Sequence, residues 1–581
     1  MSAVRCLALC ALMLCAAAGP AQAATVFPMP GSVSASPLTQ ISFRGVSPDY
    51  FMPISVRGSS SGRHDGVLRA HSDGKGVSWV PLRRFRGGER VSVRTPIAVS
   101  GARKGDFAFS VAVWPGRVRL QRAVNTVEPG KRRRFKSRPD LVPPLLSVEE
   151  GSAPAEPGYV FTTPKAKNDT MQAGPMITDL SGRMIWFQPL PGRRAATDFR
   201  VQTFRGQPVL TWWEGTSRQG IGSGTAVIAG QDYREIMRVN VPSGYRADLH
   251  EFLITPQDTA LITTYPVVKA DLRAAGGSRR GQLVDSVVQE IDLVTGSTLF
   301  EWHSRGQVPL DDSFIAPERS PRVPWDYAHA NSVSLDSDGD VLVSARNTWA
   351  VYKLDRQTGR TEWILGGRRS NFKFGTGARF AWQHDVRRRA DGALTIFDNS
   401  ASPAVAKQSR AIALKVDTGT RTARLLSARV HPRGLLAATQ GNYQSFAGGG
   451  GLVGWGSQRY LTEYDAAGRL LWDARLSVGY ESYRAYRFSW VGRPATLPKA
   501  YARRTSRGMD VFASWNGATE VATWQVLGGS SRRTLAPIGR GERSGFETRV
   551  PVNDRSVYAA VRALDAAGNV LAESKAVPVG R

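Results

Sequence analysis

The chain has 581 residues, a length that predicts more than one domain. Its content of 41% hydrophobic and 22% charged residues is typical of a globular protein. The formal net charge of +29 leaves nucleic acid and an anionic cell envelope open as partners. The basic residues are spread along the chain, and the one dense run, Lys131–Lys136, falls in an apparent linker. We therefore expect no nucleic-acid partner, whereas a general positive field would attract an anionic envelope and small anionic substrates.

The first 23 residues have the pattern of a signal peptide. Arg5 precedes an apolar stretch from Cys6 to Ala18, and Ala21-Gln22-Ala23 has the small residues of a cleavage site. The apolar stretch is too short to span a bilayer, and no later segment reaches the required length. We expect a secreted, extracellular or cell-envelope protein without a transmembrane segment in its mature form.

All three cysteines lie inside this leader segment, at Cys6, Cys10 and Cys15. Once the leader is removed, the chain can form no disulfide and no thiolate metal site. It also has no cysteine nucleophile, so any covalent catalysis must use another side chain.

Residues 24–140 are predicted to form an immunoglobulin-like β-sandwich. Short alternating runs such as Val77–Pro81 and Phe107–Val113 are typical of strands with one buried face. The basic stretch around 128–140 is interpreted as a linker to the next domain.

One hairpin pattern recurs between residues 141 and 500. An apolar strand leads to Asp, then within a few residues to Gly, and then to a second strand that carries Trp or another bulky residue. Asp bonds its own backbone and Gly accepts a positive φ, so each instance predicts a tight turn. The instances are 177–186, 288–302, 351–363, 413–419 and 461–472, with a weaker copy at 227–237. A second hairpin precedes most of them, and four strands per unit at intervals of about 50 to 80 residues predict a β-propeller.

One of these turns, Asp336-Ser-Asp-Gly-Asp340, has the acidic spacing of a calcium loop. The downstream glutamate that such a loop needs is missing. A β-turn therefore explains the segment better than a metal site.

Residues 508–581 lack the Asp–Gly–Trp hairpin and again show alternating strands. Their last hairpin, at 557–570, resembles that of a fibronectin type III or immunoglobulin-like sandwich. The segment 494–508 is interpreted as a second linker. The whole chain is thus predicted to be all-β, with a propeller flanked by two sandwich domains.

Three of the seven histidines occupy equivalent places in successive repeats. His250, His329 and His384 each precede the first strand of a unit, the strand that lines the channel of a propeller. Arg346 closes the hairpin that follows His329, and Asn331 shares a strand face with His329. Asp398 and Asn399 close the hairpin after His384 and are interpreted as turn or supporting residues. The other histidines, expected at the surface, are His64, His71, His303 and His431.

Two chemistries suit this set. Three histidines can hold zinc, copper or iron, but a guanidinium beside a metal ion is unfavourable, so no metal and no cofactor is expected. The set can instead handle an oxyanion, with Arg346 as a bidentate fork and the histidines as nucleophile, acid and base. Trp212 and Trp213 could form an aromatic wall of such a site or belong to the core.

The segment from about 148 to 495 resembles the PAPS-independent arylsulfotransferases, in particular a secreted branch found in actinobacteria and fungi. The matching blocks are Leu249–Pro256, Trp325–Val333, Ser344–Arg346, Trp363–Gly367, Trp382–Asp385, Ile396–Asn399 and Ser482–Trp490. The Asp-Tyr-x-His-x-Asn-Ser block at this distance from the Gln-His block is specific. The better-known periplasmic members carry a disulfide near the site, which this chain cannot form.

The resemblance implies a six-bladed propeller and a ping-pong transfer of a sulfuryl group from a phenolic sulfate ester to a phenol. It implies that His384 carries the sulfuryl group, that His329, Asn331 and Arg346 bind its oxygens, and that His250 exchanges a proton with the phenol. The partners would be a small aryl sulfate and a phenol. Two other functions stay open on the residues alone: a non-catalytic secreted scaffold, and a metal-dependent lyase or oxidoreductase that uses the three histidines.

Overall fold

The computed structural model describes residues 23–49, 53–103, 105–116, 118, 120, 130–149, 153–154, 157–167 and 171–580. The expected leader, with its three cysteines, lies almost wholly outside these residues. Nearly every regular element is a strand, and the described residues hold three short 3-10 helices, η1 (Arg273–Ala275), η2 (Leu310–Asp312) and η3 (Arg346–Thr348). The prediction of an all-β chain is confirmed. Within the described ranges, no helix has the length and apolar character needed to cross a membrane.

The N-terminal strands form two four-stranded antiparallel sheets that share one core, which includes Phe43, Trp79 and Phe109. Buried and exposed residues alternate in two of these strands, β3 and β7, as expected for strands with one face on a core. In pairing order, the sheets are β1 (Thr25–Phe27), β2 (Ile41–Arg44), β6 (Gly76–Pro81) and β5 (Gly66–Ala70), and β4 (Gly62–His64), β3 (Ser55–Gly58), β7 (Arg90–Arg94) and β8 (Phe107–Ser110).

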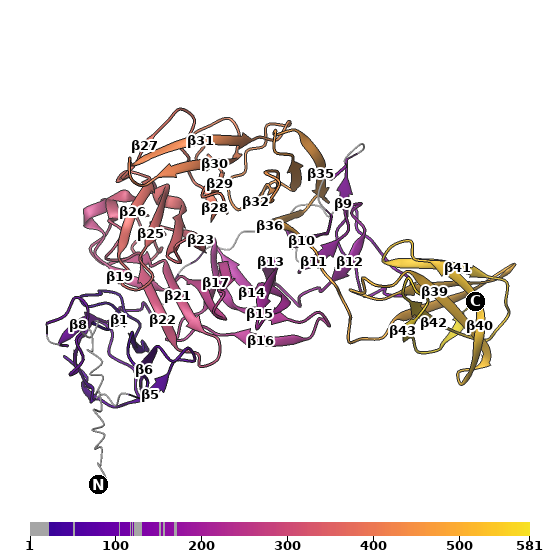
Figure 1. The fold of residues 1–581 in the computed structure, drawn as a ribbon, viewed down its shortest axis with the longest axis horizontal. Helices are drawn as coiled ribbons and strands as arrows, with labels where there is room; N and C mark the ends of the chain where they lie inside the picture. The colour runs from indigo at the N-terminus through magenta and orange to yellow at the C-terminus, as the bar shows by residue number, and fades with distance from the viewer. Residues whose placement is uncertain are drawn as a thin grey trace, which may run out of the picture.

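The central body is built around a closed ring of inner strands. These strands are β13 (Ala195–Phe204), β17 (Ala247–Ile254), β23 (Ala330–Leu335), β28 (His384–Arg388), β32 (Asn442–Ser445) and β36 (Tyr480–Phe488). Each contacts the next in this order, and β36 contacts β13, so that they surround the middle of the body (Figure 1).

Antiparallel partners extend outward from each inner strand. They are β14 (Gln207–Arg218), β15 (Ile221–Ala229) and β16 (Glu235–Val239) after β13; β18 (Thr259–Thr264), β21 (Val287–Asp292) and β22 (Thr298–His303) after β17; β24 (Val341–Ala345), β25 (Ala350–Leu354) and β26 (Thr361–Gly366) after β23; β29 (Leu394–Asp398), β30 (Arg410–Asp417) and β31 (Thr422–Arg429) after β28; β33 (Gly451–Gly454), β34 (Tyr460–Tyr464) and β35 (Leu470–Leu476) after β32; and β10 (Tyr159–Ala166), β11 (Met176–Thr178) and β12 (Met184–Phe187) after β36.

Hydrogen bonds between distant segments close the ring. β10, near the start of the body, pairs with β36 at its end, and β9 (Leu146–Val148) pairs with β35. Smaller additions are β27 (Lys373–Phe374), which pairs with β31, and the hairpin of β19 (Val267–Ala270) and β20 (Gly281–Val284). Because the first and last segments share sheets, the ring has no free edge between its two ends.

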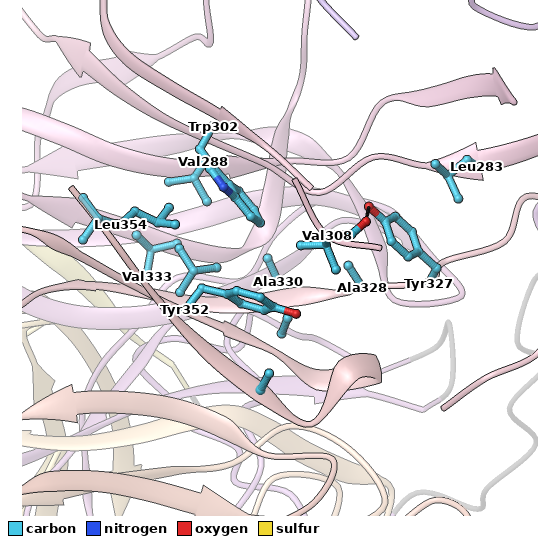
Figure 2. Packing of buried hydrophobic residues seen from close by; sticks show 14 of the residues in the cluster. Leu283, Val288, Trp302, Val308, Tyr327, Ala328, Ala330, Val333, Tyr352 and Leu354 are labelled. Atoms are coloured by element: carbon cyan, nitrogen blue, oxygen red, sulfur yellow. Dashed lines mark hydrogen bonds between the residues drawn. The ribbon is translucent and has the colours of Figure 1, made fainter. Parts of the chain in front are cut away.

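The Asp–Gly hairpins have the turn chemistry that their sequences predict. Between β25 and β26 the N–H of Gly359 donates to the carbonyl of Asp355 at 2.8 Å, and Gly359 has a φ of 71°. The tryptophans that follow such turns are buried. Figure 2 shows Trp302 of β22 near Tyr352 of β25, with ring centroids 6.2 Å apart. The bulky residue after the turn therefore fills the space between neighbouring sheets.

The acidic turn at 336–340 is occupied by an ammonium group. Lys353 Nζ lies 3.3 Å from Asp340 and 3.1 Å from Glu362, and it also contacts Asp338. Partial burial opposes the charge of Lys353, but these carboxylates raise the pKa of Lys353 above its ordinary value. The turn interpretation agrees with this geometry, because the carboxylates that a calcium ion would need are paired with a lysine.

The C-terminal strands form a third unit with its own core, which includes Val511, Trp524 and Val561. The strands are β37 (Lys499–Thr505), β38 (Gly508–Ser514), β39 (Thr523–Ser531), β40 (Thr534–Glu542), β41 (Glu547–Val552), β42 (Tyr558–Leu564), β43 (Val570–Glu573) and β44 (Val577–Gly580). The interpretation of 494–508 as a linker is wrong for its second half. β37 pairs with β38 along its whole length, and its central residue Ala502 is buried in the core of this unit.

Six charged side chains, three basic and three acidic, fill the centre of the ring. Arg484 is fully buried, and its guanidinium lies 2.8 Å from Asp198 and 3.1 Å from Glu251. Two further guanidinium groups contact Glu251, at 2.5 and 2.6 Å. Burial opposes ionisation of Glu251, but the surrounding guanidinium groups lower the pKa of Glu251 below its usual range. The six residues are Asp198 and Arg200 of β13, Glu251 of β17, Asp385 and Arg387 of β28, and Arg484 of β36.

Replacement of Arg484 by Leu should destabilise the protein strongly. The change removes one of the guanidinium groups shared by two buried carboxylates, Asp198 and Glu251. Loss of one partner costs about 3–5 kcal/mol in comparable buried pairs. Denaturant unfolding checks this, with Arg493→Leu as the control, because Arg493 forms an exposed pair with Glu520 and should have little effect. Equal stability of the two variants would contradict the role given to Arg484.

Candidate functional site

A cavity of about 540 Å³ opens at the end of the ring where the inner strands begin. His250 of β17, His329 immediately before β23 and His384 at the start of β28 all line it, together with Arg346 of η3. The rings of His250 and His329 meet edge to face, with centroids 4.7 Å apart. The structure thus brings together the three histidines and the arginine that the sequence singled out.

Irregularities in the inner strands orient these side chains toward the cavity. The pairing register shifts between Ala330 and Ser332 of β23 and between His384 and Arg387 of β28, and a similar shift occurs in β17. His329 has a φ of 58° and Asp385 a φ of 53°, in the left-handed region. A bulge adds a residue to one strand and redirects its side chains. Consequently His384 faces the cavity while the next residue, Asp385, contacts the central charges.

Each histidine has a hydrogen-bonding partner at Nδ1. The bond is 2.5 Å long for His329 and 2.7 Å for His384, and His250 is in direct contact with its partner. Such a partner holds the ring in one orientation and leaves Nε2 for chemistry. The partners are Asp248 for His250, Asp326 for His329 and Asn399 for His384.

Burial sets the charge state of the site. Desolvation, with the nearby guanidinium of Arg346, lowers the pKa of His384 well below its ordinary value, so this ring is neutral at pH 7. Desolvation raises the pKa of Asp248 to about 7 and lowers the pKa of its partner His250. The pair of Asp248 and His250 therefore carries an additional proton up to about neutral pH.

Arg346 is a buried cation without a carboxylate partner in the described part of the chain. Its guanidinium donates to Asn347 Oδ1 at 2.8 Å and to the carbonyl of Ala438 at 3.2 Å, and it stacks over Trp382 at 4.8 Å. Its Nε is buried and has no hydrogen-bonding partner within the described ranges. Burial lowers the pKa of Arg346 to about 10, which still leaves it charged at pH 7. A cation in this state is suited to bind an anion that enters the cavity.

The structure does not bring Asn331 to the cavity wall. Its side-chain N–H donates to the carbonyl of Gln383 at 2.7 Å, and the residue is fully buried. Asn331 thus supports the segment immediately before His384. Direct contact between Asn331 and a bound anion stays a prediction.

The rest of the cavity wall combines apolar and charged groups. Trp213 lines the cavity, and its indole N–H donates to the carbonyl of Ala247 at 2.9 Å, whereas Trp212 packs in the core against Trp186. Of the two tryptophans, only Trp213 forms part of the wall. Other wall residues are Ile221, Leu249, Ile315 and Trp325, which offer an apolar surface, and Lys165, Lys167 and Glu481.

Sequence reasoning missed the carboxylates that hold two of the histidines. Asp248 lies two residues before His250, and Asp326 lies three before His329. A two-residue spacing places both side chains on one face of a strand, but it does not show that they bond to each other. Asp326 lies ahead of β23, so its contact with His329 is a tertiary feature. An acidic residue two or three positions ahead of His250 and of His329 was the one clue available.

The expectation that the other four histidines lie at the surface is wrong, because each is buried against a polar partner. His303 lies 2.7 Å from Asp285 and 3.0 Å from Glu301. The bonds of the other three are 2.7, 2.8 and 3.3 Å long. These three pairs are His64 with Ser61, His71 with Ser78, and His431 with Asp473. Polar flanking sequence cannot distinguish an exposed histidine from one that a distant strand covers.

Across the ranges that the structure describes, no group of three His, Cys, Asp or Glu side chains is arranged to hold a metal ion. In the cavity the Nδ1 atoms of the three histidines are already bonded to protein side chains.

Solved structures similar to this chain show only weak likeness. A protein of unknown function from Bacteroides caccae is 13% identical, with 57% of this chain and 98% of that chain covered and a TM-score of 0.34. A protein from Lactobacillus plantarum is 12% identical, with 73% and 97% covered and a TM-score of 0.32. A virginiamycin B lyase from Staphylococcus aureus is 7% identical, with 63% and 96% covered and a TM-score of 0.25. Likeness at this level has no bearing on function.

Among curated proteins none matches this chain. The sequence model of the arylsulfotransferase (ASST) family does match, over residues 200–477. That segment contains the three cavity histidines and Arg346, from β13 to the end of β35. Residues 200–477 are therefore a segment of the arylsulfotransferase family.

Proposed function

We propose that the protein moves a sulfuryl group from a phenolic sulfate ester to a phenolic acceptor, without PAPS, through a sulfohistidine on His384. Membership of the family supports aryl sulfotransferase activity at the family level. The observation that carries the mechanism is the cavity itself. In it a neutral buried imidazole lies near a guanidinium that has no carboxylate partner among the residues that the structure describes. The first is a nucleophile, and the second is a receptor for a sulfate ester.

In the first half-reaction, Nε2 of His384 attacks the sulfur of the aryl sulfate. The S–Nε2 bond forms while the bond from sulfur to the aryl oxygen breaks, and the electron pair leaves with that oxygen. His250 donates a proton from Nε2 to the leaving oxygen, so that a phenol departs in place of a phenolate. The pair of Asp248 and His250 supplies this proton.

In the second half-reaction, an acceptor phenol returns the proton to His250. Its oxygen attacks the sulfur, the Nε2–S bond breaks, and the electron pair returns to Nε2 of His384. The cavity is restored to its starting protonation, as a ping-pong cycle requires. Arg346 and His329 bind the sulfuryl oxygens in both transition states, and Asn331 is proposed to assist them.

The finer fold assignments belong to the same proposal. The closed ring of inner strands, each with outward partners, supports a six-bladed β-propeller. The two-layered N-terminal unit and the C-terminal unit support immunoglobulin-like and fibronectin-like flanking domains. We also propose that the protein is exported to the outside or the envelope of the cell, where its positive charge favours an anionic surface.

A mass measurement on the purified protein tests the mechanism. Incubation with an aryl sulfate should add the mass of one sulfuryl group to the peptide that contains His384, and a phenol should then remove it. The His384→Ala variant should show neither the adduct nor transfer. A fully active His384→Ala variant would refute the mechanism, and loss of activity on chelation would favour a metal-dependent enzyme. A protein that forms no adduct and transfers no sulfuryl group would favour a scaffold.

Arg346 should act through its charge and its fork geometry. Arg346→Met should lower kcat/KM by about 10²- to 10³-fold, as the loss of one preorganised anion-stabilising group does elsewhere. Arg346→Lys should recover only part of that loss, since an ammonium cannot make the bidentate contact. Arg424→Met, on the exposed face of β31, is the control and should keep full activity. Equal rates for Arg346→Met and the control would contradict this role.

The rate of the first half-reaction should depend on pH through Asp248 and His250. Because burial raises the pKa of Asp248 to about 7, the pair keeps its donor proton below pH 7 and loses it above. Release of a poor leaving group such as unsubstituted phenol should therefore slow above pH 7. A nitrophenol, which leaves readily as the anion, should be much less affected.

Single-turnover kinetics with the two esters measure this difference. The Asp248→Asn variant should be slower with phenyl sulfate by about 10²-fold or more and should lose the decline above pH 7. A decline that is identical for both esters would show that another group titrates.

A further inference from the structure

The three cavity histidines differ in the group that holds Nδ1. A carboxylate bonds His250 and another bonds His329, but an amide, Asn399, bonds His384. A carboxylate stabilises the imidazolium form of its partner, whereas an amide oxygen has no net charge and accepts an N–H from a neutral ring. The nucleophile that we propose is thus the one of the three cavity histidines whose Nδ1 is held by an amide and not by a carboxyl group.

Hydrogen bonds define the orientation of the Asn399 side chain. Its Nδ2 donates to the carbonyls of Ala437 at 3.0 Å and of Gln440 at 2.9 Å. Its Oδ1 lies 2.7 Å from Nδ1 of His384, and the residue is completely buried. A flipped amide would face two carbonyl oxygens with its own oxygen, which leaves buried N–H donors without partners. Because Oδ1 can only accept, Nδ1 of His384 must carry the hydrogen.

The contact at Nε2 of His384 indicates the same tautomer independently. The backbone N–H of Gln440 donates to Nε2 of His384 at 3.2 Å. Nε2 therefore has a lone pair and no hydrogen. The amide on one side and the backbone N–H on the other both require the Nδ1–H tautomer.

We infer that Asn399 is a positioning residue that fixes the Nδ1–H tautomer of His384. Nε2 then carries a lone pair, which can attack sulfur once the substrate displaces the N–H of Gln440. This inference rests on the proposed function and deepens it. It explains why the hairpin of β28 and β29 brings its two ends together at the cavity, since His384 opens that hairpin and Asn399 follows its last residue.

The amide also suits the covalent intermediate. When the Nε2–S bond forms and the sulfur–oxygen bond breaks, the ring becomes cationic and retains its hydrogen on Nδ1. An amide oxygen is too weak a base to remove that hydrogen, so the sulfur remains bonded to a cationic ring, from which an acceptor phenol displaces it readily. A carboxylate in the same place would withdraw the proton and leave a neutral ring, which is a poorer leaving group.

Other groups around His384 also favour its neutral form. The charged or titratable groups that influence it are Arg346, His329 and His250, and burial together with each of them disfavours the imidazolium. The neutral state of the nucleophile is therefore a property of its whole surroundings, and Asn399 selects which nitrogen of the neutral ring carries the hydrogen.

Nitrogen NMR of the intact protein tests the tautomer directly. The chain has seven histidines, and the His384→Gln variant identifies the signals of one ring after ¹⁵N-histidine labelling. At pH 7 we expect His384 to show a protonated Nδ1 and an unprotonated Nε2. A protonated Nε2, whether in the other tautomer or in the imidazolium, would overturn the inference.

Kinetics of two variants separate positioning from mere structural support. Asn399→Leu and Asn399→Asp both lose the N–H donors to Ala437 and Gln440, but only Asn399→Asp keeps an oxygen for Nδ1. We expect Asn399→Leu to lower kcat by about 10²- to 10⁴-fold with a smaller effect on KM, as wrong-tautomer variants of histidine enzymes do. Asn399→Asp should retain more activity than Asn399→Leu at high pH. The acid limb of its pH–rate profile should move up by about one pH unit or more, because the introduced carboxylate favours the imidazolium form of His384.

Asn442→Asp is the matched control. Asn442 is buried and also bridges backbone groups, with bonds of 2.8 and 2.9 Å to Ala485, but it does not line the cavity. Its variant should lose stability without a shift of the acid limb. Equal loss in Asn399→Leu and Asn399→Asp, with no shift of the limb, would assign Asn399 a structural role only. The NMR result does not depend on sulfuryl transfer, so failure of this inference is distinguishable from failure of the proposed function.

Discussion

The central ion network is the constraint on which the rest of the structure depends. Arg484 of β36 lies between carboxylates of β13 and β17, and its neighbours Arg200 and Arg387 share those carboxylates. The network also reaches backbone groups of β23 and β32, so every inner strand is tied to it. Buried ion pairs of this kind contribute little net stability, but removal of one member is costly. The network therefore acts chiefly by allowing one arrangement of the ring.

The cavity chemistry follows from that arrangement. His250 precedes Glu251 and His384 precedes Asp385, so each of these histidines is adjacent in sequence to a member of the network. The bulges that send the acidic residue to the network send the histidine to the cavity. Because the network anchors one side chain of each pair, it also limits where the imidazole can lie. Precise placement of catalytic groups requires such a rigid support.

Charge is distributed differently in the central ion network and in the cavity. In the network, cations and carboxylates are paired, and the guanidinium groups of Arg387 and Arg484 lower the pKa of Glu251 against the effect of burial. In the cavity, Arg346 has no carboxylate partner among the described residues, and His384 is kept neutral by burial. The charges of the network thus balance one another, whereas the cavity can accept an anion. This contrast distinguishes the part of the molecule that supports the ring from the part that we propose binds substrate.

The sequence alone determined the all-β class and the Asp–Gly turns, and it singled out the three cavity histidines and Arg346. Those features are encoded locally or repeat along the chain, and repetition makes them visible without coordinates. Only the tertiary structure decided that Asp248 and Asp326 hold two of the rings, that Asn399 holds the third, and that Asn331 lies behind the cavity wall. It also revealed that residues 499–505 form a strand and that the remaining histidines are buried. These features depend on contacts between segments far apart in the chain and on bulges that break the two-residue strand period, and a linear pattern records neither.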